Sequence, residues 1–129
     1  MAQLIVLDAS VGIAALSADD PQHRSAATAL ASVMDAELVL AATSRAEILV
    51  GPCAAGGEAF VAARDFVDGC ETVPVTAAIA DDAAALRACH RALSLPDAIA
   101  LVVATVIEAD AIWTFDRRWS TVDSRVTHP

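Results

Sequence analysis

Four acidic residues, Asp8, Glu47, Asp97 and Asp116, stand where a carboxylate could take part in chemistry. Asp8 directly follows the apolar run LIVL, and Asp116 directly follows the similar run AIWTF. Glu47 and Asp97 lie in the segments SRAEILVG and SLPDAIAL, in the first turns of two expected helices. Carboxylate oxygens are the ligands that Mg²⁺ and Mn²⁺ prefer. If the fold brings the four side chains together, they would form a divalent-cation site.

Each acid taken singly also has a purely structural interpretation. Asp8 could cap the helix expected after it, because an aspartate at that position accepts hydrogen bonds from the first turn. Glu47 follows Ser44, and Asp97 follows Ser94, at the three-residue spacing of a capping box. The chemical interpretation therefore depends on whether the four acids meet in space.

The elements that must position these acids alternate between strands and helices. Strands are expected at residues 4–7, 37–40, 72–75, 111–115 and 125–127. Helices are expected at residues 10–17, 21–34, 43–50, 58–67, 77–93 and 96–109. The pair Gly51-Pro52 is expected to end the third helix, since proline cannot continue it, and CAAGG is expected to be a loop. Pro74 predicts that the third strand lies at an edge of its sheet or has an irregular end.

This alternation predicts one α/β domain over residues 1–129, with a mostly parallel sheet of four to five strands and helices on both faces. In this class, ligands bind outside the carboxyl ends of the strands, where the strand order reverses. Asp8 and Asp116 both follow strands, and Asp97 begins the helix that leads into the strand before Asp116. Two carboxylates about 6 Å apart repel by roughly 3 kcal/mol at an effective dielectric of about 20. Protons or a bound cation would have to relieve that repulsion.

The charge pattern narrows the classes of function. The 129 residues carry a net charge of −9, and all eight basic residues are arginine. A broad basic face for nucleic acid is excluded by this balance, and a P-loop is excluded because G-x-x-x-x-G-K-[ST] is absent. Arginine can still grip single phosphates through two hydrogen bonds. The candidates for contacts with an RNA backbone are Arg45, Arg87, Arg91, Arg117 and Arg118.

These contact candidates have competing interpretations. Surface arginines in an acidic chain are often solvated or paired with carboxylates, and a pair with Arg117 or Arg118 in a turn would explain Asp116 structurally. Trp119 is a candidate for stacking on a base, whereas Trp113, inside a strand, is expected in the core.

Three cysteines without C-x-x-C spacing indicate a reducing, cytoplasmic environment.

The N-terminus lacks the basic segment of a signal peptide, so we do not expect one here. The apolar stretch 98–107 is about half the length that spans a bilayer, so no membrane association is expected.

The segments LDASV, SRAEILVG, LPDAIAL and TFD, taken in order, resemble those of the PIN-domain ribonucleases, and within them the VapC toxins of bacterial toxin–antitoxin pairs. The resemblance covers essentially the whole chain, and LPDAIA is its most specific piece. It implies a three-layer PIN-like fold in which Asp8, Glu47, Asp97 and Asp116 match the acidic cluster. Thr114 matches a hydroxyl residue at a strand end, and Ser10 matches a commonly polar position.

The resemblance further implies a metal-dependent endoribonuclease that uses Mg²⁺ or Mn²⁺. Asp8 and Asp97 would be the principal metal ligands, and Glu47 and Asp116 would bind directly or through water, with one of these two accepting a proton from the attacking water. A VapB-type antitoxin, an RNA substrate and a homodimer are the implied partners. The small residues of GPCAAGG and the sparse basic rim depart from the family pattern and leave the RNA substrate open.

Two alternatives from other classes compete with the nuclease. A non-catalytic module could dock a basic peptide in an acidic groove, and only turnover of RNA separates it from the nuclease. A receiver-like, Mg²⁺-binding phosphate domain also uses clustered acids on such a sheet, but it relies on a lysine that this chain lacks.

Overall fold

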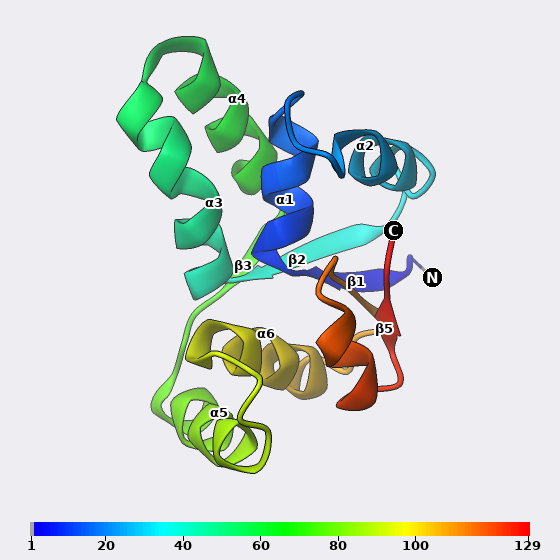
Figure 1. The fold of residues 1–129 in the computed structure, drawn as a ribbon, viewed down its shortest axis with the longest axis vertical. Helices are drawn as coiled ribbons and strands as arrows, with labels where there is room; N and C mark the ends of the chain where they lie inside the picture. The colour runs from blue at the N-terminus through cyan, green and yellow to red at the C-terminus, as the bar shows by residue number, and fades with distance from the viewer. Residues whose placement is uncertain (1) are drawn as a thin grey trace.

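A computed structural model of the protein describes residues 2–129 (Figure 1). The strands are β1 (Leu4–Leu7), β2 (Glu37–Ala41), β3 (Glu71–Val73), β4 (Ala111–Trp113) and β5 (Val126–Thr127). The helices are α1 (Ala9–Leu16), α2 (His23–Ala31), α3 (Ala42–Ala55), α4 (Gly57–Asp68), α5 (Ala77–Cys89) and α6 (Leu95–Val106), and a 3-10 helix, η1 (Arg117–Thr121), follows β4.

The strands form one five-stranded sheet in the order β3-β2-β1-β4-β5. All four strand pairs are parallel, and the register places Ile5 opposite Leu38 of β2 and Ala111 of β4. The expected fold class is confirmed. Because β1 continues to β2 on one side and pairs with β4 on the other, the strand order reverses between β1 and β4. This is the place where such sheets bind ligands.

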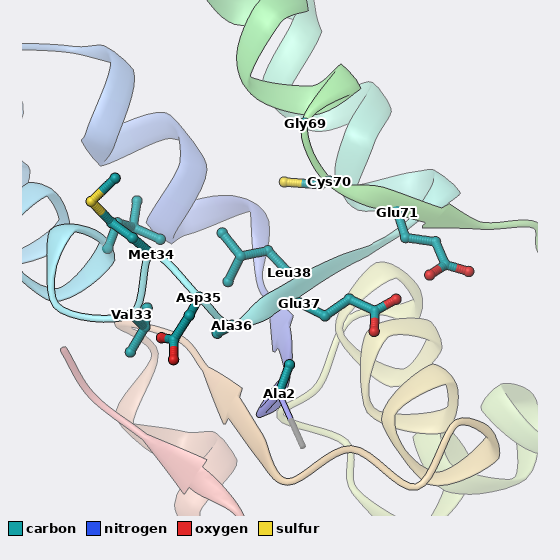
Figure 2. Close-up of a pocket in the computed structure, with 11 residues that line it drawn as sticks. Ala2, Val33, Met34, Asp35, Ala36, Glu37, Leu38, Gly69, Cys70 and Glu71 are labelled. Carbon is teal, nitrogen blue, oxygen red and sulfur yellow. The ribbon is translucent and has the colours of Figure 1, made fainter.

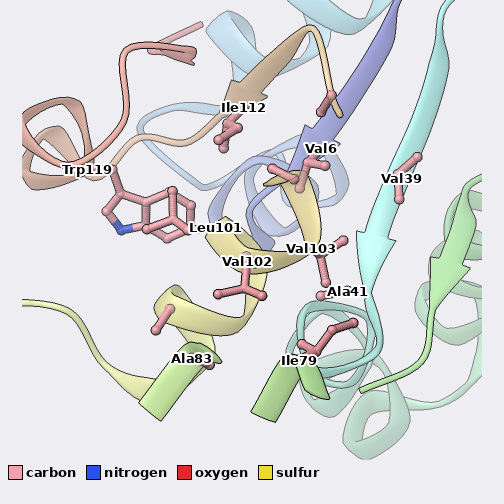
Figure 3. Close-up of a cluster of buried hydrophobic side chains, with 14 of the residues drawn as sticks. Val6, Val39, Ala41, Ile79, Ala83, Leu101, Val102, Val103, Ile112 and Trp119 are labelled. Atoms are coloured by element: carbon pink, nitrogen blue, oxygen red, sulfur yellow. The ribbon is translucent and has the colours of Figure 1, made fainter. Parts of the chain in front are cut away.

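Helices cover both faces of the sheet, with α1 to α4 on one side and α5 and α6 on the other (Figure 1). Ile5 and Leu7 of β1 pack into the cluster beneath α1 to α4, whereas Val6 packs into the cluster beneath α5, α6 and η1. Figure 3 shows this second cluster, in which Val6 and Ile112 of the sheet lie near Trp119. A strand buried on both faces must be apolar at every position, which explains the run LIVL.

The expected end of α3 at Val50 is wrong, since the helix continues through Gly51 and Pro52 to Ala55. Proline disfavours helical backbone in the preceding residue through clashes with that residue's N–H and Cβ; glycine has no Cβ, so Gly51 removes one of these clashes. The helix ends instead at Gly56, which has φ of 67°, and Gly57 has φ of 58°. Glycine adopts this left-handed region without steric strain, so the GG pair, and not the GP pair, separates α3 from α4.

Other bounds differ by a few residues. The helix α5 ends at Cys89, four residues earlier than expected, because the following segment turns to place Ser94 at the start of α6. The strand β4 ends at Trp113. The strand β3 lies at the edge of the sheet, as the proline after it predicted. By length and hydropathy, no helix within residues 2–129 qualifies as a membrane span.

Candidate functional site

Asp8 directly follows β1 at the reversal point of the sheet, and its side chain is held by two hydroxyl groups. Its Oδ2 atom accepts hydrogen bonds from Thr114 Oγ1 at 2.7 Å and from Ser10 Oγ at 2.8 Å. Asp8 occupies the position before α1, but its side chain makes no capping hydrogen bond there. The capping interpretation of Asp8 is therefore wrong, and its carboxylate belongs to the edge between β1 and β4.

The two hydroxyl groups are themselves oriented by the segment that follows β4. Ser10 Oγ accepts a hydrogen bond from the Phe115 backbone N–H at 3.2 Å, and Thr114 Oγ1 accepts one from the Asp116 N–H at 3.0 Å. Each hydroxyl then has its hydrogen left for Asp8. This arrangement fixes the direction of the Asp8 carboxylate without any cationic partner.

Opposing effects act on the pKa of the Asp8 carboxyl. Burial raises the pKa above its ordinary value, and the negative charge of Asp97 raises it further. The hydrogen bonds from Thr114 and Ser10 act in the opposite direction, because they stabilise the charged form. Burial therefore disfavours the ionised form of Asp8, and the hydrogen bonds from Thr114 and Ser10 stabilise that form.

Glu47 lies on α3 and faces the same edge. The helix begins at Ala42, so Ser44 lies within it and the predicted Ser44–Glu47 capping box is wrong. Burial raises the pKa of Glu47 first, and the charges of Asp8 and Asp97 raise it further. These three acids therefore lie within electrostatic range of one another, although they come from three separate parts of the chain.

Asp97 is the third residue of α6, and its capping box with Ser94 is confirmed. The Asp97 backbone N–H donates to Ser94 Oγ at 3.3 Å, and the Ser94 N–H donates to Asp97 Oδ2 at 3.0 Å. One carboxylate oxygen of Asp97 is thus engaged by backbone, and the other is left over. The structural interpretation and a role as metal ligand do not exclude each other.

Asp116 is tied more closely to an arginine than to the other acids. The Arg118 backbone N–H and its Nε atom donate to Asp116 Oδ1 at 3.0 and 2.9 Å. This pairing lowers the pKa of Asp116 below its ordinary value. The predicted turn pairing is confirmed for Arg118. Arg118 also feels the charge of Asp97, which places the pair beside the other acids.

The acids are neighbours but do not converge on one point. Within residues 2–129, no group of three or more histidine, cysteine, aspartate or glutamate side chains is placed to hold a single ion. The donor set is nonetheless made of carboxylate and hydroxyl oxygens, which fits Mg²⁺ or Mn²⁺ better than Zn²⁺. Burial, and to a lesser extent the neighbouring carboxylates, raise the pKa of Asp8 and Glu47, and a cation bound between them would act in the opposite direction.

Some of the arginines that are candidates for RNA contacts are held by hydrogen bonds within the protein, and others are exposed. Arg45 is held inside the fold, since it donates to the Val67 carbonyl at 3.3 Å and to Asp68 at 2.7 Å. Arg117 is exposed, and its side chain makes no hydrogen bond or ion pair within the described part of the chain. Arg87 lies in the last turn of α5, and Arg91 in the loop that leads into α6.

The prediction that Trp119 stacks on a base is wrong. Trp119 is 0% exposed and packs in the core cluster beside Val6 and Ile112, so it offers no face to a ligand. Trp113, at 8% exposed, is buried as expected. The segment around Trp119 is too short to show a hydrophobic periodicity, so the sequence could not distinguish a buried tryptophan from an exposed one.

Sequence reasoning also missed His128, which follows β5. Its Nδ1 atom lies 2.8 Å from the carbonyl oxygen of Thr114. The available signal was its place directly after a strand that ends at the same edge of the sheet.

Hollows in the surface lie both away from the acid cluster and beside it. Figure 2 shows one of about 540 Å³ at the amino ends of β2 and β3, lined in part by Met34, Asp35, Glu37 and Glu71. It lies at the opposite edge of the sheet from Asp8. A second groove, of about 450 Å³, adjoins the acids, since Glu47 lines it together with apolar residues of α1, α3 and α4.

Comparison with known proteins gives a consistent result. The family model of the PIN domain matches residues 5–124. No curated protein sequence matches the chain. Among solved structures, the chain is similar to the toxin VapC20 of Mycobacterium tuberculosis, which cleaves the sarcin-ricin loop, with a TM-score of 0.78 and 22% identity over 92% of this chain and 94% of that one.

Two complexes contain further similar chains. A toxin–antitoxin complex from Klebsiella pneumoniae has a TM-score of 0.80 and 21% identity, covering 95% of each chain. VapBC2 of Rickettsia felis, bound to a DNA fragment from its promoter, has a TM-score of 0.68 and 12% identity, covering 96% of this chain and 97% of that one.

Proposed function

We propose, from the premise that this chain belongs to the PIN domain family, that it is a metal-dependent endoribonuclease and the toxin of a VapBC-type pair. The observation that carries the proposal is the environment of Asp8. A carboxylate held by Ser10 and Thr114 at the reversal point of the sheet, beside Glu47 and Asp97, is an arrangement built for charge and not for capping.

The roles follow from the contacts of each acid. Asp8 and the free oxygen of Asp97 would be the principal ligands of Mg²⁺ or Mn²⁺, and Glu47 and Asp116 would contribute directly or through water. When bound, the ion lowers the pKa of a bound water and neutralises charge on the phosphoryl oxygens. Ser10 and Thr114 keep the Asp8 carboxylate in a fixed direction, so little reorganisation accompanies binding.

Glu47 is the better of the two candidates for accepting a proton from the attacking water. A general base works best when its pKa approaches the working pH, and the pKa of Glu47 is raised by burial and by two neighbouring charges. The pKa of Asp116 is lowered by Arg118, which makes it a weaker base.

Among the candidate arginines, we favour Arg118 and Arg117 for contacts with the RNA backbone, because both are exposed beside Asp116. Arg118 holds Asp116 from two residues away, and its exposed guanidinium could exchange that carboxylate for a phosphate, which arginine binds through two hydrogen bonds. The exchange would release Asp116 to join the other acids. The protein would thus complete its acidic cluster only when RNA arrives.

A protein partner is expected on the groove beside Glu47. Its lining includes Ile13 and Val50, which are 41% and 69% exposed, so a binding partner would remove apolar surface from water. We propose a VapB-type antitoxin there, by analogy with the complexes of similar chains. A homodimer and a cytoplasmic location complete the proposal.

A non-catalytic module that binds a basic peptide at the same acids is the second candidate. The net charge of −9 and the lack of convergence among the carboxylates favour it. The match to the PIN domain model argues against the receiver-like alternative, because receiver domains belong to a different fold family.

The decisive experiment is RNA cleavage with purified protein. Total RNA is incubated with protein and Mg²⁺ or Mn²⁺, with and without chelator, and compared with Asp8→Asn and Asp97→Asn. Asp81→Asn, an exposed acid of α5, serves as the matched control. Discrete cuts that need metal and both acids, but not Asp81, support the enzyme. Cuts that survive both substitutions, or no cuts with either metal, overturn it.

A further inference from the structure

Thr114 connects the candidate site to the C-terminal segment, because all of its polar groups are bonded. It is 0% exposed. Its hydroxyl joins Asp8 and the Asp116 N–H, as described above. On the other side, its backbone N–H donates to the Thr127 carbonyl at 3.2 Å, and its own carbonyl lies 2.8 Å from His128 Nδ1.

The contact with the Thr114 carbonyl determines that Nδ1 of the His128 ring carries a hydrogen. A carbonyl oxygen can only accept, so the hydrogen of this bond sits on Nδ1. The ring nitrogen Nε2 is left outside the contact. Asp116 feels the charge of His128, which places the ring at the same edge of the sheet as the acids.

The strand before His128 is short. β5 has only two residues, Val126 and Thr127. Backbone hydrogen bonds between this end of the chain and the β4 region include that of Thr114 with Thr127 and one from the Ile112 N–H to the Arg125 carbonyl. The His128 side chain adds a bond at the end of the strand nearest the site.

We infer that His128 is a positioning residue, which holds Thr114 through its carbonyl so that the Thr114 hydroxyl stays aimed at Asp8. This inference rests on the proposed function for its catalytic consequence, because Asp8 is there a metal ligand. His128 touches neither substrate nor metal in this assignment. Residues that orient a metal ligand through hydrogen bonds typically change metal affinity or activity by about 10- to 100-fold when lost. His128 acts through one more residue, so the lower end of that range is expected.

The test compares three variants of the full chain. His128→Ala removes the bond, and His128→Asn retains an N–H donor near the position of Nδ1. His23→Ala is a matched control, since His23 Nδ1 lies 2.8 Å from the Ala14 carbonyl, the same kind of bond at the same length but between α2 and α1. Affinity for Mn²⁺ is measured by calorimetry without RNA, and kcat and KM are measured with an RNA substrate.

We expect His128→Ala to weaken Mn²⁺ binding by about tenfold and to lower kcat by a similar factor, with KM for RNA unchanged. His128→Asn should restore both quantities to within about twofold of the wild type. His23→Ala should lower the melting temperature but leave the Mn²⁺ affinity unchanged. A purely structural role would instead move all three variants only in stability.

The outcomes separate the inference from the proposed function. If the wild type cleaves RNA and His128→Ala matches it in Mn²⁺ affinity and kcat, the inference is wrong and the nuclease stands. If His128→Ala weakens Mn²⁺ binding but the wild type cleaves no RNA, the nuclease is wrong and the positioning role stands. An asparagine variant as impaired as the alanine variant, or a wild type that binds no Mn²⁺, overturns the inference.

Discussion

Replacing Thr114 with valine removes the hydroxyl at the centre of the site and keeps the shape of the side chain. Thr114 is fully buried, but valine has nearly the same volume as threonine, so the substitution leaves no cavity that would add its own penalty. The lost bond to the Asp8 carboxylate is worth about 1.5–3 kcal/mol, as is typical for a hydrogen bond to a charged group. The Asp116 N–H also loses its acceptor, which adds about 1 kcal/mol.

The expected loss of unfolding free energy for Thr114→Val is therefore about 3 kcal/mol. For a chain of this length, such a loss corresponds to a fall of about 10 °C in melting temperature. The change also removes one of the hydrogen bonds that lower the pKa of Asp8. That pKa should rise further, so cleavage activity should need a higher pH in the variant than in the wild type.

Thr43→Val is the matched control, because Thr43 Oγ1 is buried without a hydrogen-bond partner in the described part of the chain. Removing an unsatisfied hydroxyl should leave the melting temperature unchanged or raise it. Both variants are compared with the wild type by thermal unfolding at pH 7 in chelator, and by pH profiles of RNA cleavage. If Thr114→Val loses no more stability than Thr43→Val, the reasoning that the hydroxyl network stabilises Asp8 is refuted.

Three further predictions concern pH, packing and the arginines. Burial raises the pKa of Asp8 and Glu47 in the folded protein, so at these two groups the native state binds more protons than the unfolded chain as pH rises from their ordinary values of 3.8 and 4.5 through the raised values. In that window the contribution of these two groups to the stability of the metal-free protein should fall as pH rises, and the increase in melting temperature given by Mn²⁺ should grow; an Mn²⁺ effect independent of pH would contradict this. Gly12→Ala should lower unfolding free energy by about 1–2 kcal/mol in urea, since its Cβ would lie 2.6 Å from an isoleucine side chain and overpacking outweighs the helix preference of alanine; unchanged stability would show that α1 can shift. Arg117→Gln should weaken RNA binding and reduce the slope of log binding constant against log salt concentration by about one, with an unchanged melting temperature. Arg45→Gln should lower the melting temperature and leave RNA binding unchanged. The reverse pattern would mean that Arg45 contacts RNA and Arg117 stabilises the fold.

Local features of the sequence were sufficient where neighbouring residues determine the structure. The run LIVL predicted the strand β1, and the proline after β3 predicted an edge strand. The Ser94–Asp97 capping box and the pairing of Asp116 with Arg118 were also predictable. In each case the interacting groups lie within a few residues of one another, so their contact can be predicted from their spacing in the sequence.

Local signals failed where the same short pattern is compatible with more than one structure. The Gly51-Pro52 pair resembles a helix end, yet α3 continues through it, since Gly51 has no Cβ to clash with the proline ring. The spacing of Ser44 and Glu47 resembles a capping box, yet the helix begins earlier. Trp119 was expected at the surface, but the packing of α6 against β1 and β4 opens a core position that it fills.

The sequence by itself determined which residues are acidic, which runs must be buried, and that the acids follow strands or begin helices. Only the tertiary structure decided how each acid is held. Thr114 reaches Asp8 across 106 residues of chain, and His128 reaches Thr114 from the C-terminal strand. The physical reason is that the sheet order joins β1, β4 and β5 side by side, so hydrogen bonds at their ends depend on pairing between strands that no local pattern encodes.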